Sequence, residues 1–236
     1  MTMSMTMHRT RIKICGLTRL EDVDAAVQAG ADALGFVFYP PSPRFVGAAQ
    51  AGALMAAMPP FVSPVALFVN ATLDEVVAVA RLAPFALLQF HGDETAAECA
   101  AIAAVVGRPF LRVFRMRPDT RPADLLECEH QYRTASPWFS SLLLDTYVDA
   151  YGGAGKVFDW SLIPKELAPR VVLSGGLSVS NATDAIQQVR PFALDISSGV
   201  EQHKGIKDAR KIVDFVRSVR AADATIESEH SHDPSP

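Results

Sequence analysis

The segment from Val171 to Glu201 constrains the fold of this 236-residue chain more than any other part of the sequence. Two short apolar runs, 171–173 and 192–196, each lead directly into a turn that contains glycine, and the residues between the runs have the pattern of a helix. A strand, a helix and a strand in this order predict a right-handed crossover between two parallel strands. The two glycine turns are therefore expected at the same edge of one sheet.

These two turns form a pair that is suited to hold a phosphate group. The first contains Gly175 and Gly176, and the second contains Ser198 and Gly199. Glycine lets the backbone approach a ligand closely, and the N–H groups at the start of a helix carry partial positive charge. One such turn alone is more typical of an ordinary tight turn. Two of them side by side predict a phosphate site, which recurs after strands seven and eight of (β/α)8 barrels.

Strands and helices alternate along the whole chain. Eight apolar runs separated by helical patterns predict an α/β fold, a single (β/α)8 TIM barrel with a parallel eight-stranded sheet. The runs are 11–15, 33–38, 65–69, 86–90, 110–114, 142–144, 171–173 and 192–196. An open doubly wound sheet fits less well, because no G-x-G-x-x-G follows the first run and eight units favour closure.

The barrel domain is expected to span residues 10–220 and to end in an amphipathic helix that stops at about Arg220. Residues 1–9 are expected to form a disordered leader, because they show no periodic apolar pattern. Residues 221–236 carry acidic residues, histidines and two prolines, which predicts a disordered C-terminal tail.

Two helix starts carry a T-x-x-E pattern, Thr18 with Glu21 and Thr72 with Glu75. In a capping box the threonine side chain accepts a hydrogen bond from the third backbone N–H of the helix, and the glutamate bonds back to the N-cap. We therefore expect a capping box at each of these two positions.

Composition excludes several classes of protein. Hydrophobic residues make up 49% of the chain, which is enough for a large core without a disulfide framework. The net charge is −4 and the 22 basic residues are scattered, so no nucleic-acid partner is expected. No apolar stretch approaches 18 residues and no secretion signal precedes the first run, so no membrane partner is expected either. Three cysteines are typical of a reducing compartment, here the cytoplasm.

In a parallel barrel the chemistry lies at the carboxyl ends of the strands. The residues predicted at those positions are Cys15, Phe38, Asn70, His91, Arg115, Asp145, Ser174 and Ser197. In a partly buried site, Cys15 and Asp145 would be able to act as base and acid on opposite sides of one bound molecule. The alternative for Cys15 is a small buried apolar residue, and for Asp145 a helix cap or an ion pair.

Seven short segments in register resemble the phosphoribosylanthranilate isomerase family over about residues 11–218. They are Lys13-Ile14-Cys15-Gly16, Ser42-Pro43-Arg44-Phe45, Gln89-Phe90-His91-Gly92, Leu144-Asp145-Thr146, Gly152-Gly153-Ala154-Gly155 with Phe158-Asp159-Trp160, Leu173-Ser174-Gly175-Gly176-Leu177 and Asp195-Ile196-Ser197-Ser198-Gly199-Val200-Glu201. The resemblance implies a barrel that converts N-(5-phosphoribosyl)anthranilate to 1-(2-carboxyphenylamino)-1-deoxyribulose 5-phosphate, an Amadori rearrangement in tryptophan biosynthesis. It also implies that no cofactor is needed, and no H-E-x-x-H motif or Cys/His cluster in the sequence predicts a metal site.

The resemblance also implies residue roles. Asp145 would protonate the ribose ring oxygen and open the sugar to an iminium, and the Cys15 thiolate would then remove the proton from C2. Arg44 would pair with the anthranilate carboxylate through its guanidinium group. The phosphate would be bound by the backbone N–H groups of Gly175, Gly176, Ser198 and Gly199.

Three further polar residues of these segments have other expected roles. His91 would hydrogen-bond the substrate or brace a neighbouring loop. Asp195 and Glu201 are expected to be structural and to bond backbone N–H groups around the phosphate turns, because a carboxylate beside a phosphate would repel it. The loop 151–156 is long enough to fold over a ligand as a lid, and its Ala154 stands where the family frequently has a hydroxyl residue.

Two other functions stay open on the sequence. One is another phosphate-binding barrel enzyme of aromatic amino-acid or histidine biosynthesis. An indole-glycerol-phosphate synthase would need a general-acid lysine, and a ribonucleotide-type isomerase would ordinarily have an aspartate in place of Cys15. The other is a non-catalytic protein that binds a phosphorylated ligand without turnover. In each case the expected partner is a small phosphorylated molecule, and the chain would be a monomer or a homodimer.

Overall fold

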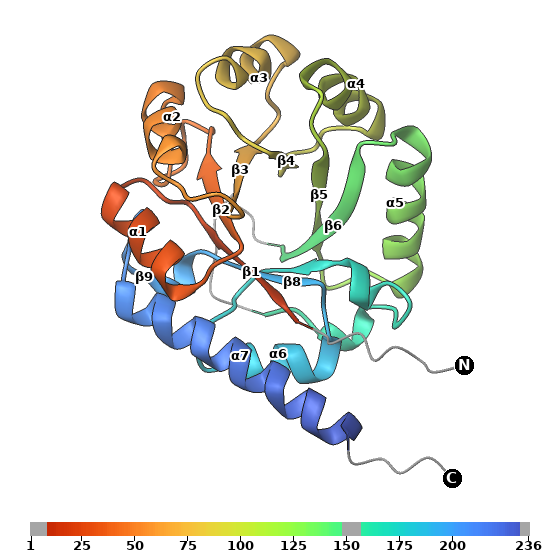
Figure 1. Cartoon of the computed structure of the whole chain (residues 1–236). Coiled ribbons are helices and arrows are strands. Elements are labelled where there is room, and N and C mark those ends of the chain that lie inside the picture. Colours follow the sequence, from red (N-terminus) through yellow and green to blue (C-terminus); the bar gives the residue numbers. More distant parts are fainter. Residues whose placement is uncertain (1–8, 148–156, 232–236) are drawn as a thin grey trace, which may run out of the picture.

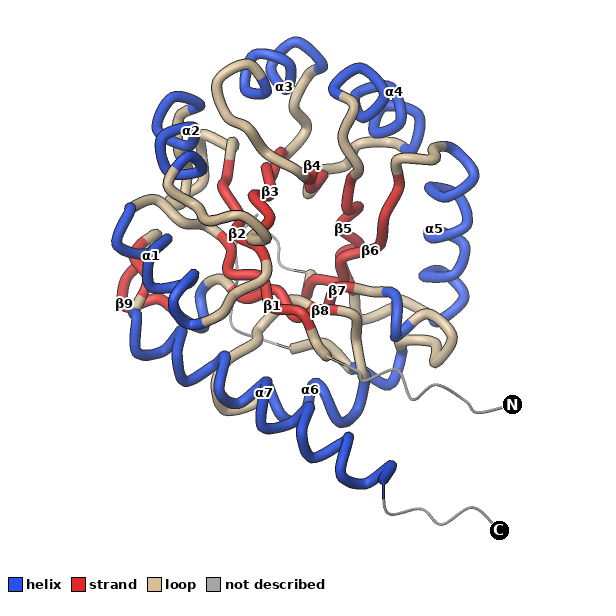
Figure 2. Tube along the Cα trace, viewed as in Figure 1, coloured by secondary structure: helices blue, strands red, loops and turns tan. Residues whose placement is uncertain are grey.

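The computed structural model describes residues 9–147 and 157–231, and within them eight parallel strands form a closed barrel in the order β1 to β8. The strands form an inner ring and the helices lie outside it (Figure 1; Figure 2). The barrel strands are β1 (Arg11–Cys15), β2 (Ala33–Val37), β3 (Ser63–Phe68), β4 (Leu87–Phe90), β5 (Phe110–Met116), β6 (Phe139–Thr146), β7 (Val172–Leu173) and β8 (Ala193–Ile196). The prediction of a (β/α)8 barrel is thus confirmed.

The helices around the ring follow the chain order. They are α1 (Leu20–Ala29), α2 (Ala48–Ala56), α3 (Leu73–Ala80), α4 (Ala96–Val106), α5 (Pro122–Ala135), α6 (Ala182–Val189) and α7 (Ala209–Ser231). The described residues also contain three 3-10 helices, η1 (Trp160–Leu162), η2 (Ala168–Arg170) and η3 (Ser198–Val200), and a hairpin of β9 (Glu201–His203) and β10 (Ile206–Lys207). Among the described helices, none is both long enough and apolar enough to cross a membrane.

Alternate residues of each strand face opposite sides of the sheet. On β1, Ile12 and Ile14 are fully buried in the large core that includes the helix-facing side of the sheet. Lys13 and Cys15 leave the same strand on the other side and point into the barrel, where Cys15 belongs to a separate small apolar cluster. The alternation in β1 therefore delivers two chemically active side chains to the barrel interior.

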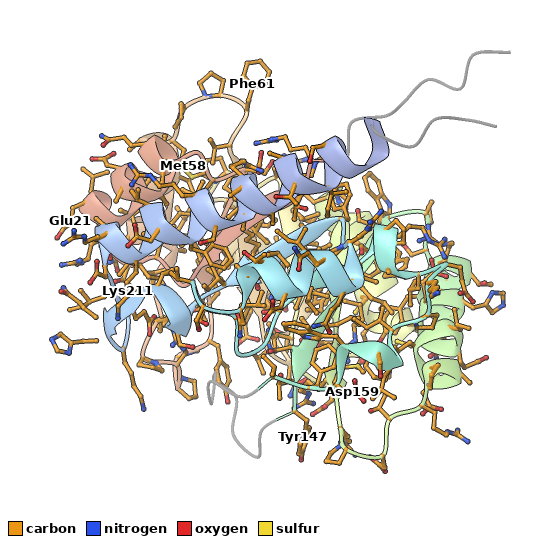
Figure 3. The ribbon with its side chains drawn as sticks, turned by 90° about the horizontal axis from the view of Figure 1, so that it is seen from below. Glu21, Met58, Phe61, Tyr147, Asp159 and Lys211 are labelled. Carbon is orange, nitrogen blue, oxygen red and sulfur yellow. The ribbon has the colours of Figure 1, made fainter. Side chains whose placement is uncertain are left out.

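The two ends of the barrel are marked by loops that lie far apart. Phe61 precedes β3 and Tyr147 follows β6, and Figure 3 places them on opposite sides of the molecule. The carboxyl ends of the strands therefore open on the side of Tyr147. β6 runs from Phe139 to Thr146, which is longer than the predicted 142–144, so Asp145 is the penultimate residue of a strand and is held by its backbone pairing to β5.

One of the two predicted capping boxes is present and the other is not. Thr72 and Glu75 form the complete box at the start of α3. At α1 the prediction is wrong, because the N-cap is Arg19 and its side chain makes no capping bond. The hydroxyl of Thr18 donates instead to Gly205 O in the hairpin, at 2.7 Å. A tertiary partner has thus displaced the local one.

The C-terminal helix is longer than the sequence analysis predicts. α7 continues to Ser231, so the expectation of a disordered tail from residue 221 is wrong for the residues up to 231. Asp223 accepts hydrogen bonds from the backbone and the hydroxyl of Thr10, at 3.0 and 2.7 Å, and Ile226 is buried. α7 packs along α1 and α6 (Figure 3). The helix therefore ties the last part of the chain to the residue before β1.

Candidate active site

A single cavity at the carboxyl ends of the strands collects the predicted site residues. Its lining includes Cys15, Arg44, His91, Asp145, Gly175, Gly176 and Ser198. Gly199 is not part of the lining, although it belongs to the same turn as Ser198. The predicted lid, 151–156, lies outside the described residues, as do residues 1–8 and 232–236.

Cys15 forms part of an apolar floor. Its side chain is at the end of β1 and packs with Val37, Leu67 and Val69, and the residue is only 5% exposed. Burial raises the pKa of the Cys15 thiol above its ordinary value, and the positive charge of Lys13 opposes that shift. Cys15 lines the cavity, so its thiol is largely shielded from water but within reach of a bound ligand.

Asp145 on β6 is paired with His91, which follows β4. His91 Nε2 lies 3.2 Å from Asp145 Oδ2, and the amide nitrogen of Gln89 lies 3.2 Å from His91 Nδ1. An amide nitrogen only donates, so Nδ1 accepts and the ring proton sits on Nε2, directed at Asp145. Both side chains stay about one fifth exposed, His91 at 20% and Asp145 at 23%, and both line the cavity. His91 thus braces a predicted catalytic carboxyl, a contact that the sequence analysis missed.

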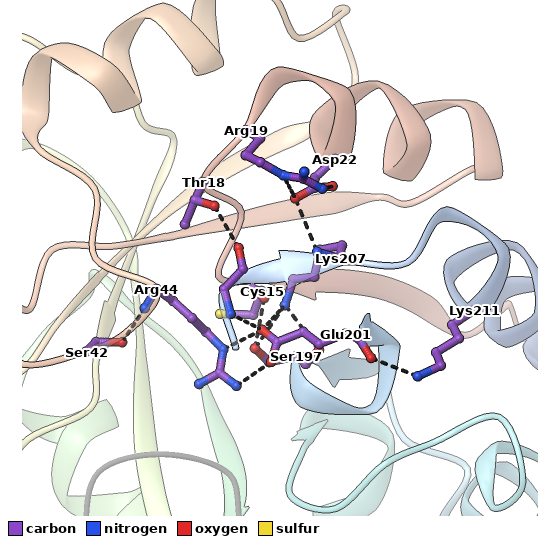
Figure 4. Close-up of polar contacts among 11 residues, drawn as sticks. Cys15, Thr18, Arg19, Asp22, Ser42, Arg44, Ser197, Glu201, Lys207 and Lys211 are labelled. Carbon is purple, nitrogen blue, oxygen red and sulfur yellow. Dashed lines mark hydrogen bonds and ion pairs between the residues drawn. The ribbon is translucent and has the colours of Figure 1, made fainter. Parts of the chain in front are cut away.

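Arg44 lies over the turn that follows β1. Gly16 in this turn has φ +78°, and a β-carbon there would collide with the Arg44 side chain. The guanidinium forms a two-point ion pair with Glu201, with Nε to Oε1 at 2.7 Å and Nη2 to Oε2 at 2.8 Å (Figure 4). This contact fixes the arginine at the rim of the cavity and leaves Nη1 for a further acceptor.

Glu201 and Lys207 connect this arginine to the second glycine turn. Glu201 Oε1 also accepts from Lys207 Nζ at 3.0 Å, and Lys207 Nζ donates to the carbonyl and the hydroxyl oxygen of Ser197 at 3.1 and 3.2 Å (Figure 4). The Ser197 hydroxyl in turn donates to Cys15 O at 2.9 Å. Because that hydroxyl proton is already used, Ser197 accepts from the lysine, and the three acceptors around Nζ match the three N–H groups of an ammonium. Burial lowers the pKa of Lys207, and the charge of Glu201 opposes that shift.

The expectation that Glu201 mainly bonds backbone N–H groups is therefore wrong. Among the described residues, Gly205 N is the one backbone N–H group that donates to its side chain, at 3.3 Å, and the shorter contacts are with Arg44 and Lys207. Burial alone would raise the pKa of Glu201, but the hydrogen bond from Arg44 and the charge of Lys207 more than offset this, and the pKa is lowered. Glu201 is a charged bridge between two cations.

Asp195 also has a different partner from the one expected. Its Oδ1 lies 2.7 Å from Lys13 Nζ, and both side chains are almost fully buried. The Ser174 hydroxyl donates to Asp195 O at 3.0 Å and lies 3.4 Å from Oδ2. A sequence signal for Lys13 existed, because it precedes Cys15 by two residues and so shares its face of the strand.

The two glycine turns come together as the sequence predicts. Gly175 and Gly176 have φ +83° and +67°, in the left-handed region that glycine adopts without strain. A β-carbon at Gly175 would collide with Thr146 N and lie 2.8 Å from Asp145 Oδ1. A β-carbon at Gly199 would collide with Leu177 O, so the two turns touch at that point. Both positions need glycine because other backbone lies against them.

The backbone N–H groups of the four predicted phosphate ligands are available. Within residues 9–147 and 157–231, no backbone hydrogen bond from the amides of Gly175, Gly176, Ser198 or Gly199 is made. Ser198 and Gly199 begin η3, and the first amides of a helix have no partner inside it. The two turns therefore present free donors next to Asp145 and Cys15.

The two other cysteines lie away from this cavity. Burial raises the pKa of Cys99 to about 12 and that of Cys128 to about 11, so both thiols stay protonated near neutral pH. Across the part of the chain that the structure describes, no group of three or more His, Cys, Asp or Glu side chains is arranged to hold a metal ion.

Comparisons with known proteins agree with this geometry. The model of the N-(5'-phosphoribosyl)anthranilate (PRA) isomerase family matches residues 12–218. The N-(5'-phosphoribosyl)anthranilate isomerase of Herminiimonas arsenicoxydans is 63% identical over 227 residues, which cover 96% of this chain and 100% of that protein.

Solved structures are similar over nearly the same length. The crystal structure of phosphoribosyl anthranilate isomerase from Thermotoga maritima has a TM-score of 0.79 at 40% identity, over 90% of this chain and 99% of that one. A crystal structure of the isomerase in complex with reduced 1-(o-carboxyphenylamino)-1-deoxyribulose 5-phosphate has a TM-score of 0.76 at 38% identity, with the same coverage of 90% and 99%.

Proposed function

Because the chain belongs to the N-(5'-phosphoribosyl)anthranilate isomerase family, we propose that its cavity uses Asp145 as general acid and Cys15 as general base. The protein isomerises N-(5'-phosphoribosyl)anthranilate to 1-(2-carboxyphenylamino)-1-deoxyribulose 5-phosphate in tryptophan biosynthesis. The observation that supports the assignment of roles is the shared cavity, which a thiol, a carboxyl and two glycine turns all line.

The first step is the opening of the ribose ring. Asp145 donates a proton to the ring oxygen, the bond from C1 to that oxygen breaks, and the nitrogen lone pair forms an iminium with C1. Asp145 is left as a carboxylate, and the N–H of His91 is positioned to hydrogen-bond it. His91 thus acts through Asp145 in this proposal rather than by binding the substrate directly.

The second step is the removal of the proton on C2. An iminium withdraws electrons from the neighbouring C–H bond, so a thiolate is a sufficient base. The electrons of the C2–H bond form a C1–C2 double bond, the nitrogen regains its lone pair, and Cys15 becomes a thiol. The resulting enolamine tautomerises to the ketone, with a proton added at C1 and one lost from the C2 hydroxyl. The chain's own residues supply both proton transfers.

The remaining contacts hold the two ends of the substrate. The free amides of Gly175, Gly176, Ser198 and Gly199 would bind the phosphate, with Gly199 contributing from the edge of the cavity. Nη1 of Arg44 would donate to the anthranilate carboxylate while its other two nitrogens stay with Glu201. The substrate would then lie across the apolar floor between Cys15 and Asp145.

The setting of the protein follows from this activity. We propose that it works in the cytoplasm, as a monomer or a homodimer, with the phosphorylated substrate as its partner and without a nucleic acid or a membrane. Neither an indole-glycerol-phosphate synthase nor a non-catalytic binding protein is favoured by a feature of the cavity.

The activity is tested with freshly generated phosphoribosylanthranilate and the fluorescence of the anthranilate group. We expect the signal to fall only when the protein is present and the Cys15→Ala variant to leave it nearly constant. Binding of the substrate without turnover by the wild-type protein would contradict the assignment of an acid and a base.

A further inference from the structure

Lys13 lies in the barrel interior beside the thiol and has no part in the mechanism above. It precedes Cys15 by two residues on β1, so both side chains leave the strand on the same face. The Lys13 side chain is only 5% exposed. Burial of an ammonium costs free energy unless it is paired, so a lysine at this depth needs a charged or polar partner.

The partner of Lys13 is Asp195, directly opposite on β8. The two residues are register partners in neighbouring strands, and Nζ lies 2.7 Å from Oδ1. Burial lowers the pKa of Lys13, but the charges of Asp195 and Cys15 more than offset this, and the pKa stays above its ordinary value. Lys13 is therefore a fixed ammonium and is not available as a base.

The space beside Gly35 brings this ammonium to the sulfur. Gly35 lies on β2 as the register partner of Cys15. A β-carbon built at Gly35 would lie 2.7 Å from Cys15 Sγ and 3.1 Å from Lys13 Nζ, so both atoms border the volume that a side chain would fill. The absence of a side chain at Gly35 is what allows the two atoms to share that space.

Lys13 has donors left for the sulfur, whereas the neighbouring Lys207 has none. Within the described ranges the only oxygen that accepts from Lys13 Nζ is Oδ1 of Asp195. Lys207 Nζ has three acceptors, two on Ser197 and one on Glu201, which use all three of its N–H groups. Of the two buried lysines near Cys15, Lys13 is the one that can direct N–H groups at it.

The charged groups around the sulfur have a net positive charge that one further negative charge would balance. The cations are Lys13 on β1, Lys207 on β10 and Arg44 after β2, and the carboxylates are Asp195 on β8 and Glu201 on β9. Three cations and two carboxylates leave one net positive charge. Asp145 and His91 face the same cavity from the ends of β6 and β4 and are paired with each other. A thiolate at Cys15 would make the buried group neutral.

We infer that Lys13 is a positioning residue for the isomerisation: its ammonium, fixed by Asp195, is the counter-charge that lets Cys15 act as a thiolate. The inference rests on the proposed role of Cys15 as general base. Without Lys13, burial would raise the pKa of the thiol with less opposition, and a protonated thiol cannot remove the C2 proton. A base works only above its pKa, so the acid limb of the rate profile should then move to higher pH.

The test uses Lys13→Met and two readouts. The first is the ultraviolet absorbance of the thiolate as pH is raised, with Cys15→Ala in the same background as the blank that removes the signal of Cys99 and Cys128. The second is the pH dependence of kcat. We expect the thiolate midpoint to rise by at least about one pH unit and kcat near neutral pH to fall about 10- to 100-fold, with partial recovery at high pH. Arg11→Met, the same charge change at the exposed end of β1, is the matched control and should behave as wild type.

A second variant protects the test against unfolding. Lys13→Met leaves Asp195 as an unpaired buried charge, so Lys13→Met/Asp195→Asn, which removes both charges, is measured as well. The double variant keeps the net charge around the sulfur, so it tests the direct N–H contact of Lys13 alone and should raise the thiolate midpoint by less than Lys13→Met does. A wild-type thiolate midpoint in either folded variant would overturn the inference. The thiolate titration does not depend on turnover. It therefore still tests the effect of Lys13 on the thiol of Cys15 if Cys15→Ala proves active and Cys15 is not the base.

Discussion

The Nε2 atom of His91 and the Oδ2 atom of Asp145 are 3.2 Å apart, and Gln89 fixes the far side of the imidazole ring. The ring therefore presents its proton to the carboxyl of the proposed acid. His91→Ala should lower kcat about 10-fold and change KM little, because the acid loses its orientation. Steady-state kinetics checks this, with the exposed His203→Ala as the control. A raised KM at constant kcat would instead make His91 a binding residue.

Cys15→Ala and Asp145→Asn should each lower kcat by about 10² to 10⁴, the usual worth of a general base or acid. Both changes are close to the original shape, so circular dichroism and the urea midpoint should stay near those of wild type. Rapid-mixing fluorescence of the anthranilate group measures the loss. If either variant kept its kcat and lost only affinity, the residue would belong to binding and not to proton transfer.

Arg44→Ala should chiefly weaken substrate binding and raise KM by about 10- to 100-fold, because a charge-assisted contact to the carboxylate is lost. The change also leaves Glu201 with one cation fewer, so Arg44→Ala/Glu201→Gln is the matched variant that separates the two effects. A substrate analogue without the anthranilate carboxylate should bind wild type and Arg44→Ala alike. Strong discrimination between the two proteins by that analogue would remove Arg44 from its proposed role.

Gly175→Ala should abolish most activity, whereas Gly30→Ala should not. Both glycines have positive φ, +83° and +94°, so each alanine would cost about 1–2 kcal/mol of folding free energy from backbone strain. Only at Gly175 would the new β-carbon meet other atoms, Thr146 N and Asp145 Oδ1. Urea unfolding together with kcat/KM distinguishes strain from displacement of the acid. Equal activity in the two variants would mean that the close approach of Gly175 to Thr146 and Asp145 does not matter for catalysis.

Removal of residues 221–236 should destabilise the barrel, because the helical part of this segment is not a free tail. The truncation deletes the acceptor for Thr10 and the buried side chain of Ile226. Asp223→Ala alone should cost about 1–3 kcal/mol, since two buried donors on Thr10 would lose their partner. Urea unfolding measures both, and Asp24→Ala, at an exposed position of α1, provides a comparison for loss of charge. A truncated chain as stable as the full one would contradict this role for α7.

The sequence predicted what depends on neighbours along the chain. Strand alternation and glycine turns are local, so the barrel, the cavity and the positions of Cys15 and Asp145 followed from them. The helical extension of α7 was missed because the acidic composition of residues 221–236 is typical of disorder. The spacing of Val219, Ala222 and Ile226, which continues the buried stripe of α7, predicts a helix there.

The missed contacts share one physical cause. The partner of Thr18 is on the hairpin after β8, and Lys13 pairs with Asp195 only because the first strand adjoins the last. Residues that are 182 positions apart along the chain become register partners through ring closure, and no local pattern encodes which carboxylate will meet which lysine. Arg44 and Glu201, 157 positions apart, show the same limit.

The pairing of β1 with β8 has a consequence for when the active site forms during synthesis and folding. Cys15 is made among the first residues of the chain, but Asp195 and Lys207 are made near its end, and all three meet only at the seam where the ring closes. A growing or partly refolded polypeptide thus holds the sulfur of the proposed base without Asp195 and Lys207. The complete site needs the pairing of β1 with β8, so the recovery of turnover during refolding reports when that seam has closed.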